Sequence, residues 1–385
     1  MTYDCGLRRE TPLAACLKRR IQASGPIGIR DYMTACLYDG EHGYYRTRPA
    51  IGRGGDFVTA PEISQVFGEL IGLWSAVVWQ QMGSPARFAL IELGPGRGTL
   101  MRDALRATRR VPGFHAAATV VLVETSETLE KEQRRTLADL SVVIRWLRAA
   151  DIRSSADLGR LPTILIANEV LDCEPRDQLV LTEAGWVRRL VGLDGAGRLA
   201  FCDGEPAEGT TAHSARRVAR IFPHARPGAV FEPSERHWSL DLLAGRSAAA
   251  ALYIDYGHVQ PMLGDTLQAV RGHRFEHPLA SPGEADLTMQ VDFARHAAIA
   301  ASQPEPLAVG GPVSQAEFLG ALGIVERASR LMAANPDQAA SIEAGVARLM
   351  QPTGMGGRFK VLGLRSRHLP ALPGLPALDS PGASP

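Results

Sequence analysis

Apolar residues recur along this chain with two different spacings, and the two spacings alternate. Unbroken apolar runs begin at Phe88 and Val120, and another follows Thr163; each has the length of a strand that is buried on both faces. Between these runs the apolar positions return every three or four residues, as on one face of a helix. Strands that alternate with helices predict a parallel sheet with right-handed crossovers, so the fold class we expect is α/β.

Helices rather than strands are expected before residue 85. Two amphipathic helices are predicted over residues 11–23 and 29–38. A longer helix is expected after Pro61, because proline is favoured in the first helical turn. Its apolar stripe consists of Ile63, Phe67, Leu70, Trp74 and Val78. This N-terminal part is expected to pack on the sheet domain.

The pattern changes again in the second half of the chain. Residues 178–203 alternate between apolar and polar types and contain Asp-Gly and Gly-Arg turns, which predicts an inserted antiparallel ribbon. Residues 249–257 return to a buried strand that ends in an acid. A helical segment is predicted over residues 314–350, and the run from Arg358 predicts a terminal strand.

These elements define three expected regions. The N-terminal helical segment covers residues 1–84, and the α/β domain covers residues 85–368. Insertions are expected within that domain at about residues 175–248 and 259–350. Residues 369–385 are rich in proline and are expected to form a disordered tail.

Composition limits the classes of binding partner and the cellular compartment that we expect. The 385 residues carry a formal net charge of +1 and no basic stripe with interleaved aromatics, which argues against a nucleic-acid partner. The five cysteines contain no C-x-x-C pair, so we expect reduced thiols in a cytoplasmic protein. No apolar run reaches membrane-spanning length, and the N-terminus lacks a signal-peptide core, so membrane insertion is not expected.

The stretch "FALIELGPGRGTL" at residues 88–100 places three glycines between a strand and a helix. Glycine permits positive φ and lets a ligand lie against the main chain, while the next helix offers unpaired N–H groups. No Gly-Lys-Ser/Thr follows, which counts against a nucleoside triphosphate. The spacing of Gly94, Gly96 and Gly98 is G-x-G-x-G rather than the dinucleotide fingerprint G-x-G-x-x-G.

Two acids at strand ends refine the nature of the ligand. Glu92, two residues before the first glycine, would repel a pyrophosphate and suits a cationic group. S-adenosylmethionine carries an ammonium, a sulfonium and no phosphate, so it fits this turn. Glu124 ends the second strand, where it can accept both ribose hydroxyls of an adenosine. Because NAD would use the same device, a nicotinamide-dependent oxidoreductase remains an alternative.

Further polar residues follow the next two strands of the predicted sheet. Asn168, Glu169 and Asp172 come at and after the end of one strand, and Asp255 ends another. Because ligands bind at the carboxyl ends of parallel strands, these acids predict a crevice that favours a cationic substrate. The alternative interpretation of Asn168 and Glu169 is a helix cap with an exposed acid.

A metal site is not expected in this chain. His273 and His277 are four residues apart and would share one face of a helix. However, the surrounding glycine and proline break that helix, which argues against a metal-ligating pair.

Five motifs in order carry a family resemblance. They are "GYYRTRPAIGRGGDFVTAPEISQVFGELIGLW", "IELGPGRGTL", "ANEVLDCEP", "YIDYGH" and "RGHRFEHPLASPGEADLTMQVDF". Over about residues 13–364 the chain resembles the MidA-type S-adenosylmethionine-dependent methyltransferases, whose mitochondrial members are complex I assembly factors. The resemblance implies a class I methyltransferase fold, which is Rossmann-like. It also implies methylation of an arginine in a protein substrate, a respiratory complex I subunit.

The resemblance also implies roles for individual residues. Gly94, Gly96 and Gly98 would hold the methionine end of the cofactor, and Glu124 would hold its ribose. A loop in the N-terminal segment would close over the cofactor with Gly55, Asp56, Thr59 and Glu62, and we count Glu92 and Asn168 with the same site.

For an arginine acceptor we expect paired carboxylates, because these can bind the guanidinium fork and localise its charge. Glu169 and Asp172 are expected in that role, with Asp255 behind them. Val170 and Leu171 stand where aromatic residues are common in the family, and His258 stands where tyrosine is common. A noncatalytic assembly chaperone with a cofactor pocket remains an alternative, and a homodimer is left open.

Overall fold

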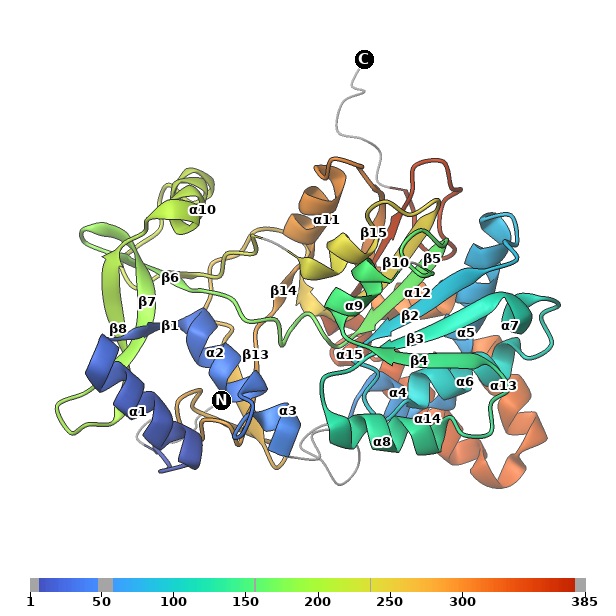
Figure 1. Ribbon diagram of the computed structural model, residues 1–385, viewed down its shortest axis with the longest axis horizontal. Coiled ribbons are helices and arrows are strands. Elements are labelled where there is room, and N and C mark those ends of the chain that lie inside the picture. Colours follow the sequence, from blue (N-terminus) through green and yellow to red (C-terminus); the bar gives the residue numbers. More distant parts are fainter. Residues whose placement is uncertain (1–6, 48–57, 156, 236, 378–385) are drawn as a thin grey trace, which may run out of the picture. The chain divides into compact units, whose positions relative to one another are not determined.

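The computed structural model describes residues 7–47, 58–155, 157–235 and 237–377, and the statements below concern these ranges. The chain forms two compact units. The first comprises residues 1–57, 172–235 and 260–290, and the second comprises residues 58–171, 236–259 and 291–385. Figure 1 labels their helices and strands.

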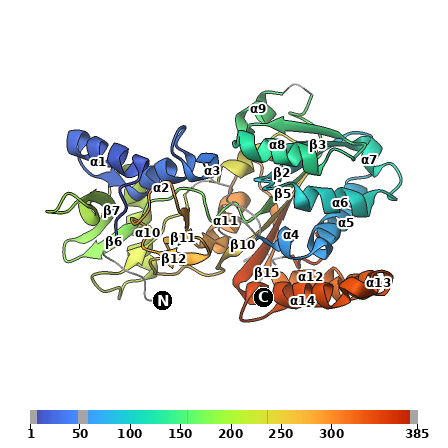
Figure 2. The ribbon, with the colours of Figure 1, turned by 90° about the horizontal axis from the view of Figure 1, so that it is seen from below.

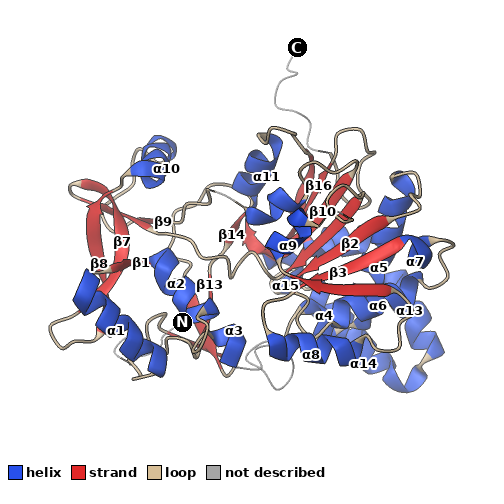
Figure 3. Ribbon diagram, in the orientation of Figure 1, coloured by secondary structure: helices blue, strands red, loops and turns tan. Residues whose placement is uncertain are grey.

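An eight-stranded sheet forms the centre of the second unit, with the strand order β15-β16-β10-β5-β2-β3-β4 and with β14 paired to β10. Figure 3 shows its strands in red. The parallel part consists of β2 (Phe88–Leu93), β3 (Ala118–Val123), β4 (Val143–Leu147), β5 (Thr163–Asn168), β10 (Ala249–His258) and β14 (Val291–Asp292). An antiparallel edge follows, made of β16 (Phe359–Arg365) and β15 (Ala308–Ser314). The mostly parallel α/β sheet expected from the apolar runs is therefore confirmed.

Side chains of successive strand residues point to opposite faces of this sheet, and each face has its own apolar core. Phe88 and Leu90 of β2 pack in one core, whereas Ala89 and Ile91 pack in the other. By this alternation Glu92 points to the same face as Phe88 and Leu90.

Helices cover both faces of the sheet. The Phe88 face is covered by α4 (Ala60–Ile63), α5 (Gln65–Gln81), α6 (Thr99–Thr108), α7 (Phe114–Ala117), α12 (Gln315–Ala321), α13 (Ile324–Ala334), α14 (Ala339–Met350) and α15 (Met355–Arg358). The opposite face is covered by α9 (Ala149–Ser154), η1 (Trp238–Leu242) and α11 (Phe293–Ala301). Helix α8 (Glu127–Thr136) follows β3, and the short helix η2 (Pro336–Gln338) precedes α14. The helical segment predicted over residues 314–350 thus contains three α-helices.

The single helix expected after Pro61 is in fact two helices. Ser64 has an extended backbone and ends α4, and its hydroxyl accepts a hydrogen bond from Val66 N at the start of α5. A serine that caps the next helix competes with helix continuation, and the uninterrupted apolar stripe concealed this break.

The described part of the first unit contains two antiparallel sheets and four helices. Its five-stranded sheet consists of β1 (Ile27–Gly28), β6 (Leu179–Thr182), β7 (Gly185–Leu193), β8 (Leu199–Pro206) and β9 (Val230–Phe231), and its three-stranded sheet of β11 (Gln268–Arg271), β12 (Arg274–Glu276) and β13 (Asp286–Thr288). Its helices are α1 (Pro12–Ser24), α2 (Ile29–Tyr38), α3 (Tyr44–Thr47) and α10 (Gly209–Ile221). Strands β6, β7 and β8 form the antiparallel ribbon predicted over residues 178–203. No helix in the described ranges has the length and apolar character needed to cross a bilayer.

Two boundaries differ from the expected regions. Residues 58–84 group with the sheet unit, whereas the residues before them group with the ribbon. The proline-rich tail is packed as far as residue 377, because Leu369, Leu372 and Leu375 are buried and Trp74 Nε1 donates a hydrogen bond to the Pro373 carbonyl. The apolar surface buried by these leucines outweighs the compositional tendency to disorder.

The contact between α5 and α6 generates the first prediction (Figure 2). A Cβ on Gly72 would lie 2.4 Å from the carbonyl oxygen of Ala104 and 2.5 Å from the Cα of Ala104. Backbone atoms cannot move out of the way as a flexible side chain can, so the two helices would have to separate. Gly72→Ala should therefore lower the free energy of unfolding by about 1–3 kcal/mol, measured by chemical denaturation.

Gly320→Ala is the matched control in α12, where the nearest atom to the new Cβ is Met350 Cε at 3.8 Å. It should leave stability equal or slightly higher, because alanine is the better helix former. Equal midpoints for Gly72→Ala and the wild type would contradict close backbone packing at this crossing.

Candidate functional site

The strand order marks one place in the sheet unit where a ligand is expected. The chain leaves β2 for β3 and β4 on one side, and returns to β5 on the other side of β2. Such a reversal leaves a crevice outside the carboxyl ends of the two central strands, here β2 and β5. The glycine turn follows β2, Glu124 follows β3, and Asn168 ends β5, so the sheet brings these predicted site residues to one edge.

The glycine turn has the backbone that its sequence predicts. Gly94, Gly96 and Gly98 have φ values of +58°, +54° and +81°, in the region that other L-residues avoid. Gly94 N donates a hydrogen bond to the Val123 carbonyl at 3.1 Å, which ties the turn to the end of β3. Helix α6 begins directly after the turn, so its first N–H groups border the crevice.

Glu92 is a buried acid directly before this turn. Its side chain is 3% exposed, and its Oε2 atom has no hydrogen-bond partner among the described residues. Burial raises the pKa of the Glu92 carboxyl to about 8, since few groups around it compensate the charged form. A carboxyl group held in this way is prepared to receive a cation or a hydrogen-bond donor.

Glu124 is held by its own chain and by α8. Its Oε1 accepts hydrogen bonds from the N–H groups of Thr125 (2.7 Å) and Ser126 (2.8 Å). Its Oε2 accepts one from Gln133 Nε2 at 2.9 Å. Desolvation raises the pKa of Glu124, and the hydrogen bonds from Ser126 and Gln133 partly oppose the shift. The carboxylate is thus oriented before any ligand arrives.

Sequence reasoning missed Gln133, which is completely buried in α8. Besides Glu124, its side-chain nitrogen also reaches the Gly96 carbonyl at 2.8 Å. Leu129 and Gln133 are the buried residues of α8 and lie one turn apart. The signal that could have identified Gln133 is an amide side chain on the buried face of the helix that follows Glu124.

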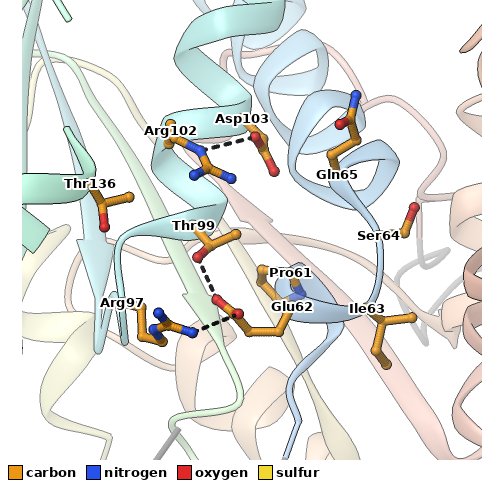
Figure 4. A pocket seen from close by; sticks show the side chains of 10 residues that line it. All are labelled: Pro61, Glu62, Ile63, Ser64, Gln65, Arg97, Thr99, Arg102, Asp103 and Thr136. Atoms are coloured by element: carbon orange, nitrogen blue, oxygen red, sulfur yellow. Dashed lines mark hydrogen bonds and ion pairs between the residues drawn. The ribbon is translucent and has the colours of Figure 1, made fainter. Parts of the chain in front are cut away.

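Glu62 connects the helix α4 to the glycine turn. It accepts a hydrogen bond from the Thr99 hydroxyl, and its other oxygen lies 3.4 Å from an Arg97 nitrogen (Figure 4). These side chains line a polar pocket of about 310 Å³, together with Gln65, Arg102, Asp103 and neighbouring residues. Thr59 occupies the N-cap position of α4, but its side chain makes no capping hydrogen bond. Gly55 and Asp56, expected in the covering loop, lie outside the described residues.

Glu169 provides the missing cap. It has a positive φ of +53°, and its Oε1 accepts hydrogen bonds from Ala60 N at 2.9 Å and from Asn168 Nδ2 at 3.1 Å. A helix cap is the alternative interpretation of Asn168 and Glu169 from the sequence. Glu169 indeed binds a helix N-terminus, but one that lies 109 residues earlier in the chain.

Asp255 supports the loop that carries Glu169. Its side chain is 1% exposed, and its Oδ2 accepts hydrogen bonds from the N–H groups of Val170 (3.1 Å) and Leu171 (2.9 Å). Its Oδ1 accepts one from Tyr256 N at 2.9 Å. The bonds from Val170 and Leu171 fix the backbone at the end of β5, so Asp255 acts on the site through this loop.

Asp172, the remaining expected acid, belongs to the first unit. Its backbone carbonyl accepts a hydrogen bond from Met289 N at 2.8 Å, and its side chain is buried. In the same unit Tyr38 donates to the Cys173 carbonyl and Tyr45 donates to Asp286. The structure therefore groups Glu169 and Asp255 in one unit and Asp172 in the other.

The two histidines considered as metal ligands are not on a helix. They flank β12, and His273 has a positive φ of +59°. Burial, followed by the charges of Arg8 and Arg189, lowers the pKa of His277 to about 4. Among the described residues no group of three or more His, Cys, Asp or Glu side chains is arranged to hold a metal ion.

With this geometry in place, comparison with known proteins identifies the family. The model of a family of S-adenosyl-L-methionine-dependent methyltransferases matches residues 70–312. The chain belongs to this methyltransferase family. The nicotinamide-dependent alternative is therefore set aside, and S-adenosylmethionine is confirmed as the cofactor.

Relatives of this methyltransferase cover most of the chain. The protein arginine methyltransferase NDUFAF7 homolog of Drosophila melanogaster is 34% identical, over 94% of this chain and 87% of the relative. Human protein arginine methyltransferase NDUFAF7 is 33% identical, over 92% of this chain and 83% of the relative. These relatives confirm the family resemblance drawn from the five motifs.

A solved structure supports the fold assignment. A COG1565 superfamily member from Burkholderia thailandensis, bound to S-adenosyl-homocysteine, superposes with a TM-score of 0.80 at 28% identity. The superposition covers 96% of this chain and 97% of that chain. The class I methyltransferase fold is thereby confirmed.

One expectation is wrong. Cysteine usage suggested a cytoplasmic protein, but the fly, mouse and human relatives of this methyltransferase are mitochondrial proteins. Reduced, well-separated cysteines are compatible with more than one compartment, so they could not decide this point.

Burial of Glu92 predicts how stability changes with pH. The folded pKa of about 8 lies above the usual value of 4.5, so between these pH values the folded protein keeps a proton that the unfolded chain has lost. Stability should fall as pH rises through this window, by up to about 1.4 kcal/mol per pH unit. Glu92→Gln removes this dependence and should be more stable than the wild type at pH 7.5, but no more stable at pH 4.5.

The measurement is chemical denaturation of the ligand-free protein at several pH values. Glu326→Gln, an exposed change in the first turn of α13, is the control and should follow the wild-type profile. Parallel profiles for the wild type and Glu92→Gln would refute the raised pKa.

Proposed function

We propose that this methyltransferase transfers a methyl group from S-adenosylmethionine to an arginine of a protein, and that the acceptor is a respiratory complex I subunit. Family membership supports the methyl transfer, and the arginine methyltransferase relatives in fly and human support the acceptor residue. The complex I acceptor follows from the resemblance to the MidA-type proteins. The observation that carries the site is Glu92, a buried carboxyl beside the glycine turn, one of whose oxygens has no partner within the described part of the chain.

The residues at this edge of the sheet fit the cofactor group by group. Glu92 would pair with the cationic end of the methionine moiety, and Gly94, Gly96 and Gly98 would allow that moiety to lie against the main chain. The start of α6 would offer N–H groups to its carboxylate. Glu124 would accept hydrogen bonds from the ribose hydroxyls. When bound, the cofactor supplies a methyl group already activated by a positively charged sulfur.

Because the methyl group is already activated, the protein has mainly to align the acceptor with it. An arginine guanidinium carries a delocalised positive charge that carboxylates can bind and localise. Glu169 is our choice for this contact, because it lies at the end of β5 next to the proposed cofactor site. Asp255 keeps Glu169 in position through the Val170 and Leu171 N–H groups. The expected contact of Asp172 with the acceptor guanidinium stays a prediction.

The function is tested by methyl transfer itself. The purified chain, incubated with S-adenosylmethionine labelled in the methyl group, should label complex I subunits isolated from a strain that lacks the gene. Mass spectrometry should then find methylarginine in a subunit of the wild type and an unmodified arginine at that site in the deletion strain. Identical spectra from the two strains, with no labelling in vitro, would favour a noncatalytic assembly chaperone.

A further prediction separates substrate binding from cofactor binding. In Glu169→Gln the side-chain oxygen can still accept from Ala60 N, so the cap on α4 is retained while the charge is lost. Cofactor affinity should stay within about twofold of the wild type. The rate of methyl transfer should fall at least tenfold, because a charged hydrogen bond of about 1.5–3 kcal/mol is lost.

Calorimetry, thermal melting and a methyl-transfer assay on the same preparation decide between the alternatives. Glu169→Ala, which also loses the cap, should in addition be destabilised by about 1 kcal/mol. If Glu169→Gln transfers methyl groups at the wild-type rate, Glu169 is only a cap. If rate and cofactor affinity fall together, Glu169 contacts the cofactor rather than the acceptor.

A further inference from the structure

Gln133 uses its whole side chain to join three elements of the sheet unit. Its Nε2 donates to the Gly96 carbonyl at 2.8 Å and to Glu124 Oε2 at 2.9 Å. Its Oε1 accepts from Trp146 Nε1 at 2.9 Å. These partners belong to the glycine turn, the end of β3 and the strand β4, and Gln133 itself is fully buried in α8.

The chemistry of Trp146 fixes which way the amide points. An indole N–H can only donate, so the oxygen of Gln133 must face Trp146. Both amide protons then face the two acceptors, Gly96 and Glu124. No other orientation satisfies all three partners, and a buried partner left unsatisfied is costly.

The two contacts of the amide nitrogen orient both halves of the proposed cofactor site. Glu124 Oε1 already accepts hydrogen bonds from the Thr125 and Ser126 N–H groups. The bond from Gln133 to Oε2 holds the second oxygen, so the plane of the carboxylate is fixed. At the turn, holding the Gly96 carbonyl also fixes the opposite direction of the Arg97 N–H, because the peptide unit is planar and trans.

A second link from α8 to the turn is weaker. Arg97 Nε lies 2.7 Å from Glu132 Oε1, but the two side chains are 39% and 33% exposed. Solvent screening leaves such a pair with little net effect. The turn is also close to Gln133 at Gly98, whose added Cβ would lie 3.5 Å from Gln133 Cα. The buried amide is therefore the main polar connection between α8 and the turn.

We infer that Gln133 is a positioning residue that couples the glycine turn to Glu124, so that the two ends of the cofactor are recognised as one unit. The inference rests on the proposed roles of Glu124 and of the turn in cofactor binding, and it does not depend on the acceptor. Gln133 touches neither half of the ligand in this scheme and acts through its two acceptors.

The experiment measures affinity for S-adenosyl-homocysteine and for adenosine by calorimetry. Gln133→Leu keeps the approximate size of the side chain and removes both donors, so Glu124 and the turn lose their orientation. Affinity for both probes should fall about tenfold or more. In a Glu124→Ala background the same change should reduce adenosine affinity by less than about threefold, because the residue through which Gln133 acts is gone.

Gln133→Glu tests the contact by charge. Its carboxyl would face that of Glu124, and at pH 8 the two charges repel, so adenosine affinity relative to the wild type should fall at least tenfold. At pH 6 one of the two carboxyls is protonated and can donate a hydrogen bond to the other. The adenosine affinity of the variant relative to the wild type should therefore recover severalfold. A residue that only fills space would show no such dependence on pH.

Gln315→Leu is the matched control. Gln315 is also fully buried in the sheet unit, where its Nε2 donates to the Leu349 carbonyl at 2.9 Å, far from the turn in sequence. Its replacement should lower the melting temperature and leave both affinities unchanged. If Gln133→Leu does not fold, Trp146→Phe removes the donor that orients the amide and should lower affinity severalfold.

The outcomes distinguish the inference from the proposal on which it rests. Unchanged adenosine affinity in Glu124→Ala would overturn the ribose role of Glu124, and the coupling with it. Reduced affinity in Glu124→Ala but unchanged affinity in Gln133→Leu would overturn the inference alone. Fully additive losses in the double variant would also overturn it.

Discussion

The proposed site depends on one buried carboxyl group at the end of the central strand. Strand alternation turns Glu92 to the face that carries the larger helical layer, where water does not compensate its charge. Its ionisation is therefore unfavourable until a cation arrives, and the cofactor of this family carries an ammonium group that would supply one. Burial of the Glu92 carboxyl lowers the stability of the ligand-free protein when that group is ionised. The same burial would favour binding of a positively charged ligand over a neutral or negative one.

The surrounding polar contacts keep that edge of the sheet rigid. Glu62 joins α4 to the start of α6, and Gln133 joins α8 to the glycine turn and to Glu124. Asp255 holds the end of β5 by the N–H groups of Val170 and Leu171. Each acid or amide is buried or partly buried and has its partners in place, so little reordering is left for the moment of binding.

The acids expected to meet the acceptor therefore differ in what they do. Asp255 shapes the loop, whereas Glu169 combines a structural contact, the cap of α4, with the proposed contact to a guanidinium. This double use explains why a helix cap and a catalytic acid could not be told apart from the sequence. A carboxylate oxygen accepts more than one donor, so the two roles are chemically compatible.

The sequence by itself determined the central parallel strands, the glycine turn and the strand ends at which the proposed cofactor residues lie. Local sequence suffices for these, because a strand buried on both faces is almost continuously apolar and a turn with several residues at positive φ strongly favours glycine. Only the tertiary structure decided which partners these residues meet. Glu169 caps a helix 109 residues away, Asp255 binds N–H groups 84 and 85 residues earlier, and Leu369, Leu372 and Leu375 pack a tail that composition predicted to be disordered. Such pairings arise from strand order and side-chain packing, which bring distant segments together and leave no periodic trace in the chain.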